Sequence, residues 1–278
     1  MALINGHQLI ELLEEKGQVG GAFNTTNLET TVGILKAVEE TGIPAFIQVA
    51  PTNVTFSGYE YIFDMVSRYA KTMKTPVALH LDHGKTFESV KLAIDAGFTS
   101  VMIDGAAYNF DENITFTKRA VDYAKPFGIP VEAELGAIGG KEDEPVSESA
   151  LKTDPNQVEE FVERTGCDLL AVSIGNVHGL DDIPVIDMPL LKEVSERSPI
   201  PLVIHGGSGI EDSFMRQFKN HNVVKINIAS DLRNAYIRTF GEAYNKNNNE
   251  ASLIKVSEKA VEAVYQVVKK NIYLINNL

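Results

Sequence analysis

Short apolar segments alternate with amphipathic ones along the whole chain. Several apolar segments are rich in Val and Ile, and many are bounded by Gly or Pro, as is typical of buried parallel strands. They occupy residues 19–24, 44–50, 77–83, 100–105, 131–137, 169–175, 201–207 and 223–229. Strands that alternate with helices in this way predict an α/β fold, a single (β/α)8 TIM-barrel domain over residues 1–278. The alternative, an open doubly wound sheet, is disfavoured because no G-x-G-x-x-G turn follows the first strand.

Helix signals lie between and beyond the predicted strands. Residues 86–97 begin with a Thr at a capping position and end on Gly, and residues 153–166 show Asp as a cap, Pro just inside and Gly at the end. Residues 27–42 carry an apolar stripe at helical spacing, made of Leu28, Val32, Leu35 and Val38. We also expect an extra N-terminal helix, and a C-terminal helical tail that packs on the barrel or on a partner subunit. Apolar positions of this tail include Ile254, Ala260, Val264 and Val268.

One connection differs from the others. Residues 138–153, "IGGKEDEPVSESALKT", are led by Gly, acidic and longer than most loops that follow a barrel strand. These features predict a mobile active-site loop. A solvated surface loop is the alternative interpretation.

Composition and charge narrow the possible functions. With 44% hydrophobic and 23% charged residues the chain is ordinarily globular, and we expect neither a membrane span nor a signal peptide. A net charge of −13 argues against nucleic acids and anionic membranes as main partners, although local backbone N–H groups and a metal ion can still hold a small anion. The single cysteine, Cys167, permits no internal disulfide, so we expect a structural thiol and a cytoplasmic protein.

Polar side chains gather where the predicted strands end. In a barrel of this type the carboxyl ends of the strands carry the chemistry. Three of the six histidines fall there, and each precedes a Gly: His83, His178 and His205. Convergent imidazoles suit a catalytic divalent metal ion, zinc first. The other polar residues at or near strand ends are Asn24, Asp82, Asp104, Glu134 and Asn227.

The last two predicted strands lead into a second candidate site. "HGGSG" (205–209) is a Gly-rich turn before a helix, and "NIASD" (227–231) also leads from a strand into a helix. Barrels often bind phosphate with these two loops, through backbone N–H groups and a helix N-terminus. A plain tight turn is the alternative for the first loop.

Taken in order, the motifs "LHLDHG", "VMIDG", "VEAELG", "GNVHG", "VIHGGSGI" and "KINIASD" resemble those of the class II, metal-dependent fructose/tagatose-bisphosphate aldolases. The resemblance covers nearly the whole chain. It implies a zinc-dependent lyase on a TIM barrel, a homodimer or homotetramer, that cleaves a ketose 1,6-bisphosphate reversibly to dihydroxyacetone phosphate and glyceraldehyde 3-phosphate.

The resemblance also implies residue roles by position. His83, His178 and His205 match the zinc ligands, while Asp104 and Glu134 match alternative metal positions or groups that orient the ligands. Asp82 matches the acid that handles the proton on the aldehyde carbonyl, and Glu142 matches the mobile carboxylate that removes the α-proton of the ketone. A monovalent cation often accompanies the bound phosphate. The residues that match the phosphate-binding end are Gly179, Gly206, Gly207, Ser208, Asn227, Ile228, Ala229 and Ser230.

Two departures from the family pattern affect the aldehyde half of the substrate. "LDDIP" places Asp181 and Asp182 where many relatives carry an aromatic residue and a lysine, and Asn176 stands where a small hydroxyl residue is usual. Another phosphorylated or acidic ketose is therefore an alternative substrate. A non-catalytic sugar-phosphate-binding subunit and a different barrel metalloenzyme, such as a hydrolase, are the remaining alternatives. Neither explains a metal triad, an acid and a loop carboxylate together.

Overall fold

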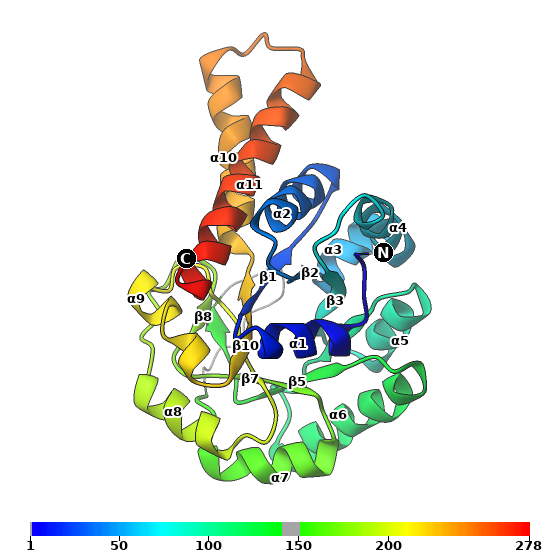
Figure 1. Ribbon diagram of the computed structural model, residues 1–278, viewed down its shortest axis with the longest axis vertical. Helices are drawn as coiled ribbons and strands as arrows, with labels where there is room; N and C mark the ends of the chain where they lie inside the picture. Colours follow the sequence, from blue (N-terminus) through cyan, green and yellow to red (C-terminus); the bar gives the residue numbers. More distant parts are fainter. Residues whose placement is uncertain (1, 141–150) are drawn as a thin grey trace.

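A computed structural model describes residues 2–140 and 151–278, and within them eight parallel strands close into a barrel (Figure 1). The order around the barrel is β1, β10, β9, β7, β5, β4, β3, β2. These strands are β1 (Gly20–Asn24), β2 (Ala45–Val49), β3 (Val77–Gly84), β4 (Ser100–Ile103), β5 (Val131–Leu135), β7 (Leu169–Val172), β9 (Leu202–Ile204) and β10 (Val223–Ile228). The predicted barrel is confirmed, since each of the eight apolar segments supplies one strand, and the open sheet is excluded.

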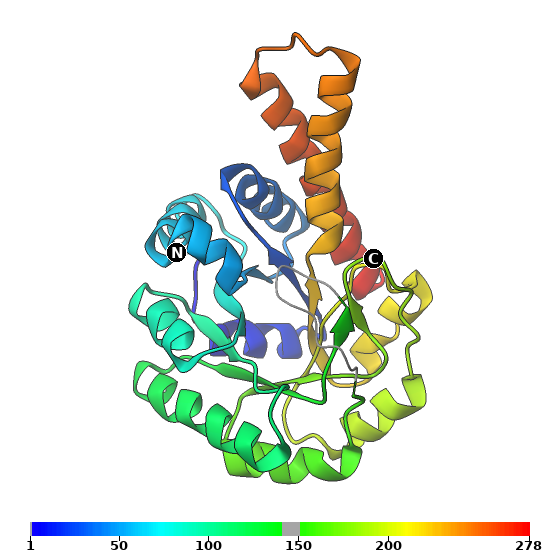
Figure 2. The ribbon, with the colours of Figure 1, turned by 180° about the vertical axis from the view of Figure 1, so that it is seen from behind.

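Helices surround the barrel, as both views show (Figures 1 and 2). They are α1 (Gly6–Glu15), α2 (Leu28–Thr41), α3 (Pro51–Ser57), α4 (Tyr59–Ala70), α5 (Phe87–Asp95), α6 (Phe110–Ala124), α7 (Pro155–Thr165), α8 (Met188–Arg197), α9 (Asp212–Met215), α10 (Ser230–Lys246) and α11 (Leu253–Asn276). The predicted caps are present: Thr86 accepts a hydrogen bond from the Ser89 amide (3.1 Å), and Asp154 from the Asn156 amide (2.9 Å). Among the described residues no helix has the length and apolar character that a membrane span requires.

Apolar side chains fill the amino-terminal end of the barrel. The extra helix α1 lies across this end, and its Leu9, Ile10 and Leu13 pack on interior residues such as Phe46 and Met102. Because this end is closed by apolar packing, the opposite, carboxyl end of the barrel is the one left open for a functional site.

Helices α10 and α11 pack together and extend beyond the barrel as an arm (Figure 1). As predicted, α11 buries Ala260, Val264 and Val268. Ile254, by contrast, is 74% exposed, and Leu28 of α2 is 60% exposed. Both line a surface hollow between α2 and α11 instead of facing the barrel.

Most of the predicted mobile loop, residues 141–150, lies outside the described residues, and so does Glu142. Its described ends are held in place. The short strand β6 (Gly139–Gly140) pairs with β8 (Val177–His178), and Ala137 pairs with Leu151. The described segment before the loop therefore reaches His178, and the segment after the loop pairs with Ala137.

Candidate metal centre and active site

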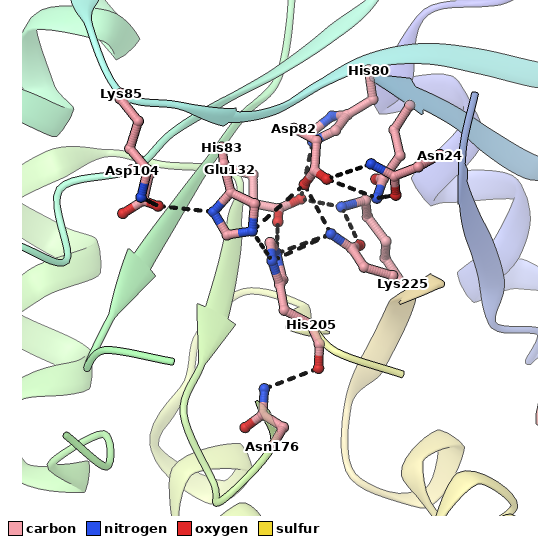
Figure 3. Close-up of polar contacts among 12 residues, drawn as sticks. Asn24, His80, Asp82, His83, Lys85, Asp104, Glu132, Asn176, His205 and Lys225 are labelled. Atoms are coloured by element: carbon pink, nitrogen blue, oxygen red, sulfur yellow. Dashed lines mark hydrogen bonds and ion pairs between the residues drawn. The ribbon is translucent and has the colours of Figure 1, made fainter. Parts of the chain in front are cut away.

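The carboxyl ends of β1, β3, β4 and β9 bring five of the sequence-predicted polar residues to one place (Figure 3): Asn24, Asp82, His83, Asp104 and His205. Asp82 and His83 lie just before Gly84, the last residue of β3, and Asp104 directly follows β4. His205 directly follows β9, and His178 ends β8. The structure thus joins residues that are more than a hundred positions apart in the sequence.

An irregularity in β3 lets two consecutive residues share the site. Successive side chains of a strand normally point to opposite faces. Here the β3–β4 register shifts between Leu81 and Gly84, and His83 has a φ of 47°, in the left-handed region. Asp82 Oδ1 consequently lies 4.0 Å from His83 Nε2. A non-Gly residue in this conformation costs roughly 1–3 kcal/mol, so the surrounding contacts must hold it.

The three predicted metal-binding histidines converge. One ring nitrogen each of His83, His178 and His205 lies within 4.8 Å of the other two. His83 Nε2 and His205 Nδ1 are 2.9 Å apart, and buried His178 Nε2 has no hydrogen-bond partner among the described residues. Three imidazole nitrogens with room for substrate are the donor set of catalytic zinc sites. The residues therefore fit a divalent metal ion that prefers nitrogen ligands.

Carboxylates favour positive charge at this centre. Asp104 Oδ2 lies 2.8 Å from His83 Nδ1, on the side of the ring away from His205. Burial opposes a charge on His83, but the attraction of Asp82 and Asp104 outweighs burial and raises the pKa of His83 to about 10. The same electrostatic field stabilises a bound cation.

A second group of possible ligands consists of His83, Asp104 and Glu134, whose donor atoms also lie within 4.8 Å of one another. Burial, followed by repulsion from Asp104, raises the pKa of Glu134 to about 8. Glu134 Oε2 has no hydrogen-bond partner among the described residues. Lys85 Nζ contacts Asp104 Oδ2 at 2.6 Å. Asp104 and Glu134 thus lie where they can bind a metal ion at a second position or orient His83.

Asp82 is held by amide groups from three strands (Figure 3). Its Oδ2 accepts hydrogen bonds from Asn24 Nδ2 (2.9 Å) and Gln48 Nε2 (3.2 Å), and its Oδ1 accepts one from Asn227 Nδ2 (3.0 Å). Burial would raise the pKa of Asp82, but His83, His205 and then Lys225 outweigh burial and lower it. Asp82 is therefore an ionised, fixed acceptor beside the histidines.

The two predicted phosphate loops meet at the start of α10. Ser208 Oγ accepts a hydrogen bond from the Asp231 amide at 3.2 Å, and the Gly207 amide donates to the Asn227 carbonyl at 2.8 Å. The N-cap residue of α10, Ala229, offers no side-chain cap of its own, and Arg233 Nη2 lies 3.2 Å from Ser230 Oγ. A helix N-terminus next to a guanidinium suits an anion.

Gly206 is required by the backbone beside His205. Its φ is 63°, and a Cβ there would lie 2.1 Å from the Val177 carbonyl oxygen. Gly206→Ala must therefore displace the β8 segment that carries His178. Gly128 has a similar φ of 64° but nothing within 4 Å of its Cβ position.

We expect Gly206→Ala to weaken zinc binding at least 10-fold, measured by competition with a chelator. Gly128→Ala should lose only the roughly 1–2 kcal/mol cost of a left-handed alanine and bind zinc like the wild type. Equal zinc affinity in both variants would show that the Gly206 turn does not position His178.

Sequence reasoning missed several residues of the site. Glu132, Lys225 and Gln48 are fully buried around it, and Lys85 contacts Asp104. The sequence does carry a signal for Glu132 and Lys225. Side chains two positions apart share a strand face, so Glu132 lies on the face of Glu134 and Lys225 on the face of Asn227. A charged residue inside an apolar strand indicates a buried partner.

Asn176, a departure from the family pattern, lies directly behind the candidate site. It is 1% exposed and bonds the backbone, accepting from the Ile174 amide (2.8 Å) and donating to the His205 carbonyl (3.0 Å). It therefore supports the strand end that carries His205. Asp181 and Asp182 are exposed.

Comparisons with known proteins agree over nearly the whole chain. The family model described as "Fructose-bisphosphate aldolase class-II" matches residues 4–277. A fructose-bisphosphate aldolase of Staphylococcus epidermidis is 36% identical over 276 residues, covering 98% of this chain and 96% of that protein. One of Geobacillus stearothermophilus is 39% identical over 254 residues, covering 90% and 88%. The crystal structure of the YdjI aldolase of Escherichia coli superposes with a TM-score of 0.85 at 33% identity, covering 98% and 97%.

Proposed function

The chain belongs to the class II fructose-bisphosphate aldolase family, and on this premise we propose that it cleaves a ketose 1,6-bisphosphate, of the fructose or tagatose type, reversibly to dihydroxyacetone phosphate and glyceraldehyde 3-phosphate. The observation that carries this proposal is the position of Asp82. It is a buried carboxylate, held by three amide groups, 4.0 Å from the imidazole of His83 and beside two further convergent imidazoles.

Zinc is the proposed metal ion, and His83, His178 and His205 are its proposed ligands. Asp104 and Glu134 are proposed as alternative metal ligands or as groups that orient His83. When bound, zinc supplies Lewis-acid stabilisation of the negative charge that develops on the ketose half. The donor set of three imidazole nitrogens supports this choice.

Asp82 handles the proton of the bond cleavage. The bond between C3 and C4 of the ketose breaks, and its electron pair stays on the dihydroxyacetone phosphate half as an enediolate. The ionised carboxylate of Asp82 accepts the proton of the C4 hydroxyl, whose oxygen becomes the aldehyde carbonyl. Because its pKa is lowered, Asp82 begins the cleavage as a base, and it returns the proton in the condensation direction.

Glu142 is the proposed partner for the second proton. By family resemblance it protonates C3 of the enediolate during cleavage and removes the α-proton of dihydroxyacetone phosphate during condensation. Residues 138–153 are proposed as the mobile loop that carries this carboxylate to the site. The pairing of Gly140 with His178 supports the proposal because it anchors one end of the loop at the metal centre.

The two loops at the start of α10 are proposed to bind the C1 phosphate, with a monovalent cation beside it. The residues involved are Gly179, Gly206, Gly207, Ser208, Asn227, Ile228, Ala229 and Ser230. We further propose a cytoplasmic homodimer or homotetramer. Exposed apolar side chains on the α10–α11 arm, such as Ile237 and Tyr244, support an interface there, since such residues mark association surfaces.

A charge change at Asp181 tests whether the enzyme requires a phosphate at the aldehyde end of the substrate. We expect kcat/KM for fructose and tagatose 1,6-bisphosphates to exceed that of the 1-phosphates by less than about 100-fold, since exposed Asp181 repels a terminal phosphate. Asp181→Lys should increase this preference by up to about 10-fold, the size of exposed charge interactions. The measurement is cleavage of all four sugars with a coupled readout of dihydroxyacetone phosphate.

Asp64→Lys makes the same charge change on α4 and should alter nothing. If both bisphosphates exceed the 1-phosphates by several orders of magnitude and Asp181→Lys has no effect, the enzyme is an ordinary bisphosphate aldolase with a strict aldehyde end. If none of the four sugars yields dihydroxyacetone phosphate, the proposed reaction is wrong.

A further inference from the structure

Two charged residues lie fully buried behind the metal centre and have no part in the proposed chemistry. Glu132 of β5 and Lys225 of β10 are both 0% exposed, and Lys225 Nζ lies 2.9 Å from Glu132 Oε2 (Figure 3). A buried ion pair contributes little net stability, because desolvation offsets the attraction. Its presence in the barrel interior therefore calls for another reason.

Glu132 determines how His205 presents its ring. Glu132 Oε1 lies 2.8 Å from His205 Nε2, while His205 Nδ1 faces His83 Nε2 at 2.9 Å. An ionised carboxylate can only accept hydrogen bonds, so the proton of the imidazole must sit on Nε2. The lone pair of Nδ1 is then directed toward His83, where the metal ion would bind.

Lys225 determines how Asn227 presents its amide. An ammonium group can only donate, and Lys225 Nζ donates to Asn227 Oδ1 at 2.8 Å. This contact fixes the amide orientation, so that Asn227 Nδ2 faces Asp82 Oδ1 at 3.0 Å. Lys225 is thereby linked to two residues of the site. It contacts His205 indirectly through Glu132, and Asp82 indirectly through Asn227.

We propose that Glu132 and Lys225 are a positioning pair: Glu132 fixes His205 as a metal ligand, and Lys225 balances the charge of Glu132 and orients Asn227 toward Asp82. The inference rests on the proposed function, because it assigns His205 to the metal ion and Asp82 to proton transfer. The positioning pair affects zinc affinity and turnover through different residues, so the two quantities should change independently. Removal of an ordinary core contact would not separate them.

The test uses the full chain and measures the zinc dissociation constant by chelator competition, kcat for fructose 1,6-bisphosphate at saturating zinc, and the melting temperature. In Glu132→Gln the new amide must turn its NH2 toward either Lys225 or His205, both of which are donors. We expect zinc affinity to fall roughly 10–100-fold. Adding Lys225→Met removes the opposing ammonium, so the Gln oxygen can face His205 and zinc affinity should recover.

Turnover should not recover in this double variant. Without Lys225 the Asn227 amide is free to turn, and a misplaced Asp82 should keep kcat on the order of 10²-fold below the wild type. Leu169→Ala, in the apolar barrel interior, is the stability control. It should lower the melting temperature while leaving the zinc affinity and kcat unchanged.

Unchanged zinc affinity in Glu132→Gln, no recovery in the double variant, or full turnover in the double variant would each overturn the positioning pair while leaving the proposed function intact. A wild-type protein that neither binds zinc nor cleaves the sugar would overturn both. The two failures are therefore distinguishable in one set of measurements.

Discussion

Asp82→Asn should lower kcat for cleavage by roughly 10²–10⁴-fold, the usual contribution of an acid–base group, while zinc stays bound. The carboxamide has nearly the shape of the carboxylate, but its oxygen is too weak a base to take the C4 hydroxyl proton. Asp82 itself is no predicted zinc ligand, and its contacts run to the amides of Asn24, Gln48 and Asn227. Metal content and steady-state cleavage of fructose 1,6-bisphosphate measure the two effects separately.

Comparison of Glu142→Ala with Asp82→Asn shows which carboxylate transfers which proton. It should abolish exchange of the α-proton of dihydroxyacetone phosphate with solvent, while Asp82→Asn should retain more of that exchange. Both variants should keep their zinc. If both lose zinc equally, the two carboxylates support the metal centre and the assignment of proton transfer is mistaken.

His178→Ala is expected to have the second large effect, a loss of bound zinc and of activity on the order of 10³-fold or more, because Lewis-acid stabilisation is worth several kcal/mol. His178 is the most selective position for this test. Its Nε2 has no hydrogen-bond partner among the described residues, so the substitution removes a ligand without breaking another contact of that atom. Zinc content and kcat are the measurements.

His221→Ala removes a histidine from the loop before β10 and should leave zinc content and kcat unchanged. A His178→Ala protein that retained one zinc ion per chain and full activity would contradict the assignment of the three histidines.

The barrel was predictable because its signals are local. Val- and Ile-rich segments bounded by Gly or Pro mark the strands, and capping residues such as Thr86 and Asp154 mark helix starts. The position of each His before a Gly then placed the candidate ligands at one end of the barrel. These inferences need no knowledge of which strands are neighbours.

The rest of the site depends on contacts between distant strands. The register shift at Asp82 and His83 arises where β3 pairs with β4, and nothing in "LDHG" alone requires it. Glu132 and Lys225 balance each other's charge only because β5 and β10 face each other across the barrel interior. The role of Asn176 depends on such a contact too, since its partner, the His205 carbonyl, lies 29 positions away.

The exposed ends of the apolar stripes have a similar cause. Leu28 and Ile254 follow the helical period of their segments, yet they lie at the hollow between α2 and α11. Periodicity identifies the apolar face of a helix but not how far along its length a neighbour covers that face.

Zinc titration of metal-stripped protein decides whether the cleavage of a ketose bisphosphate depends on the metal ion. Release of dihydroxyacetone phosphate from fructose 1,6-bisphosphate is followed as zinc is added by equivalents. We expect only background activity without metal, and activity that rises in proportion to added zinc up to a stoichiometric endpoint. Full activity in metal-free protein, together with a lysine adduct trapped by borohydride, would contradict it and indicate Schiff-base chemistry instead.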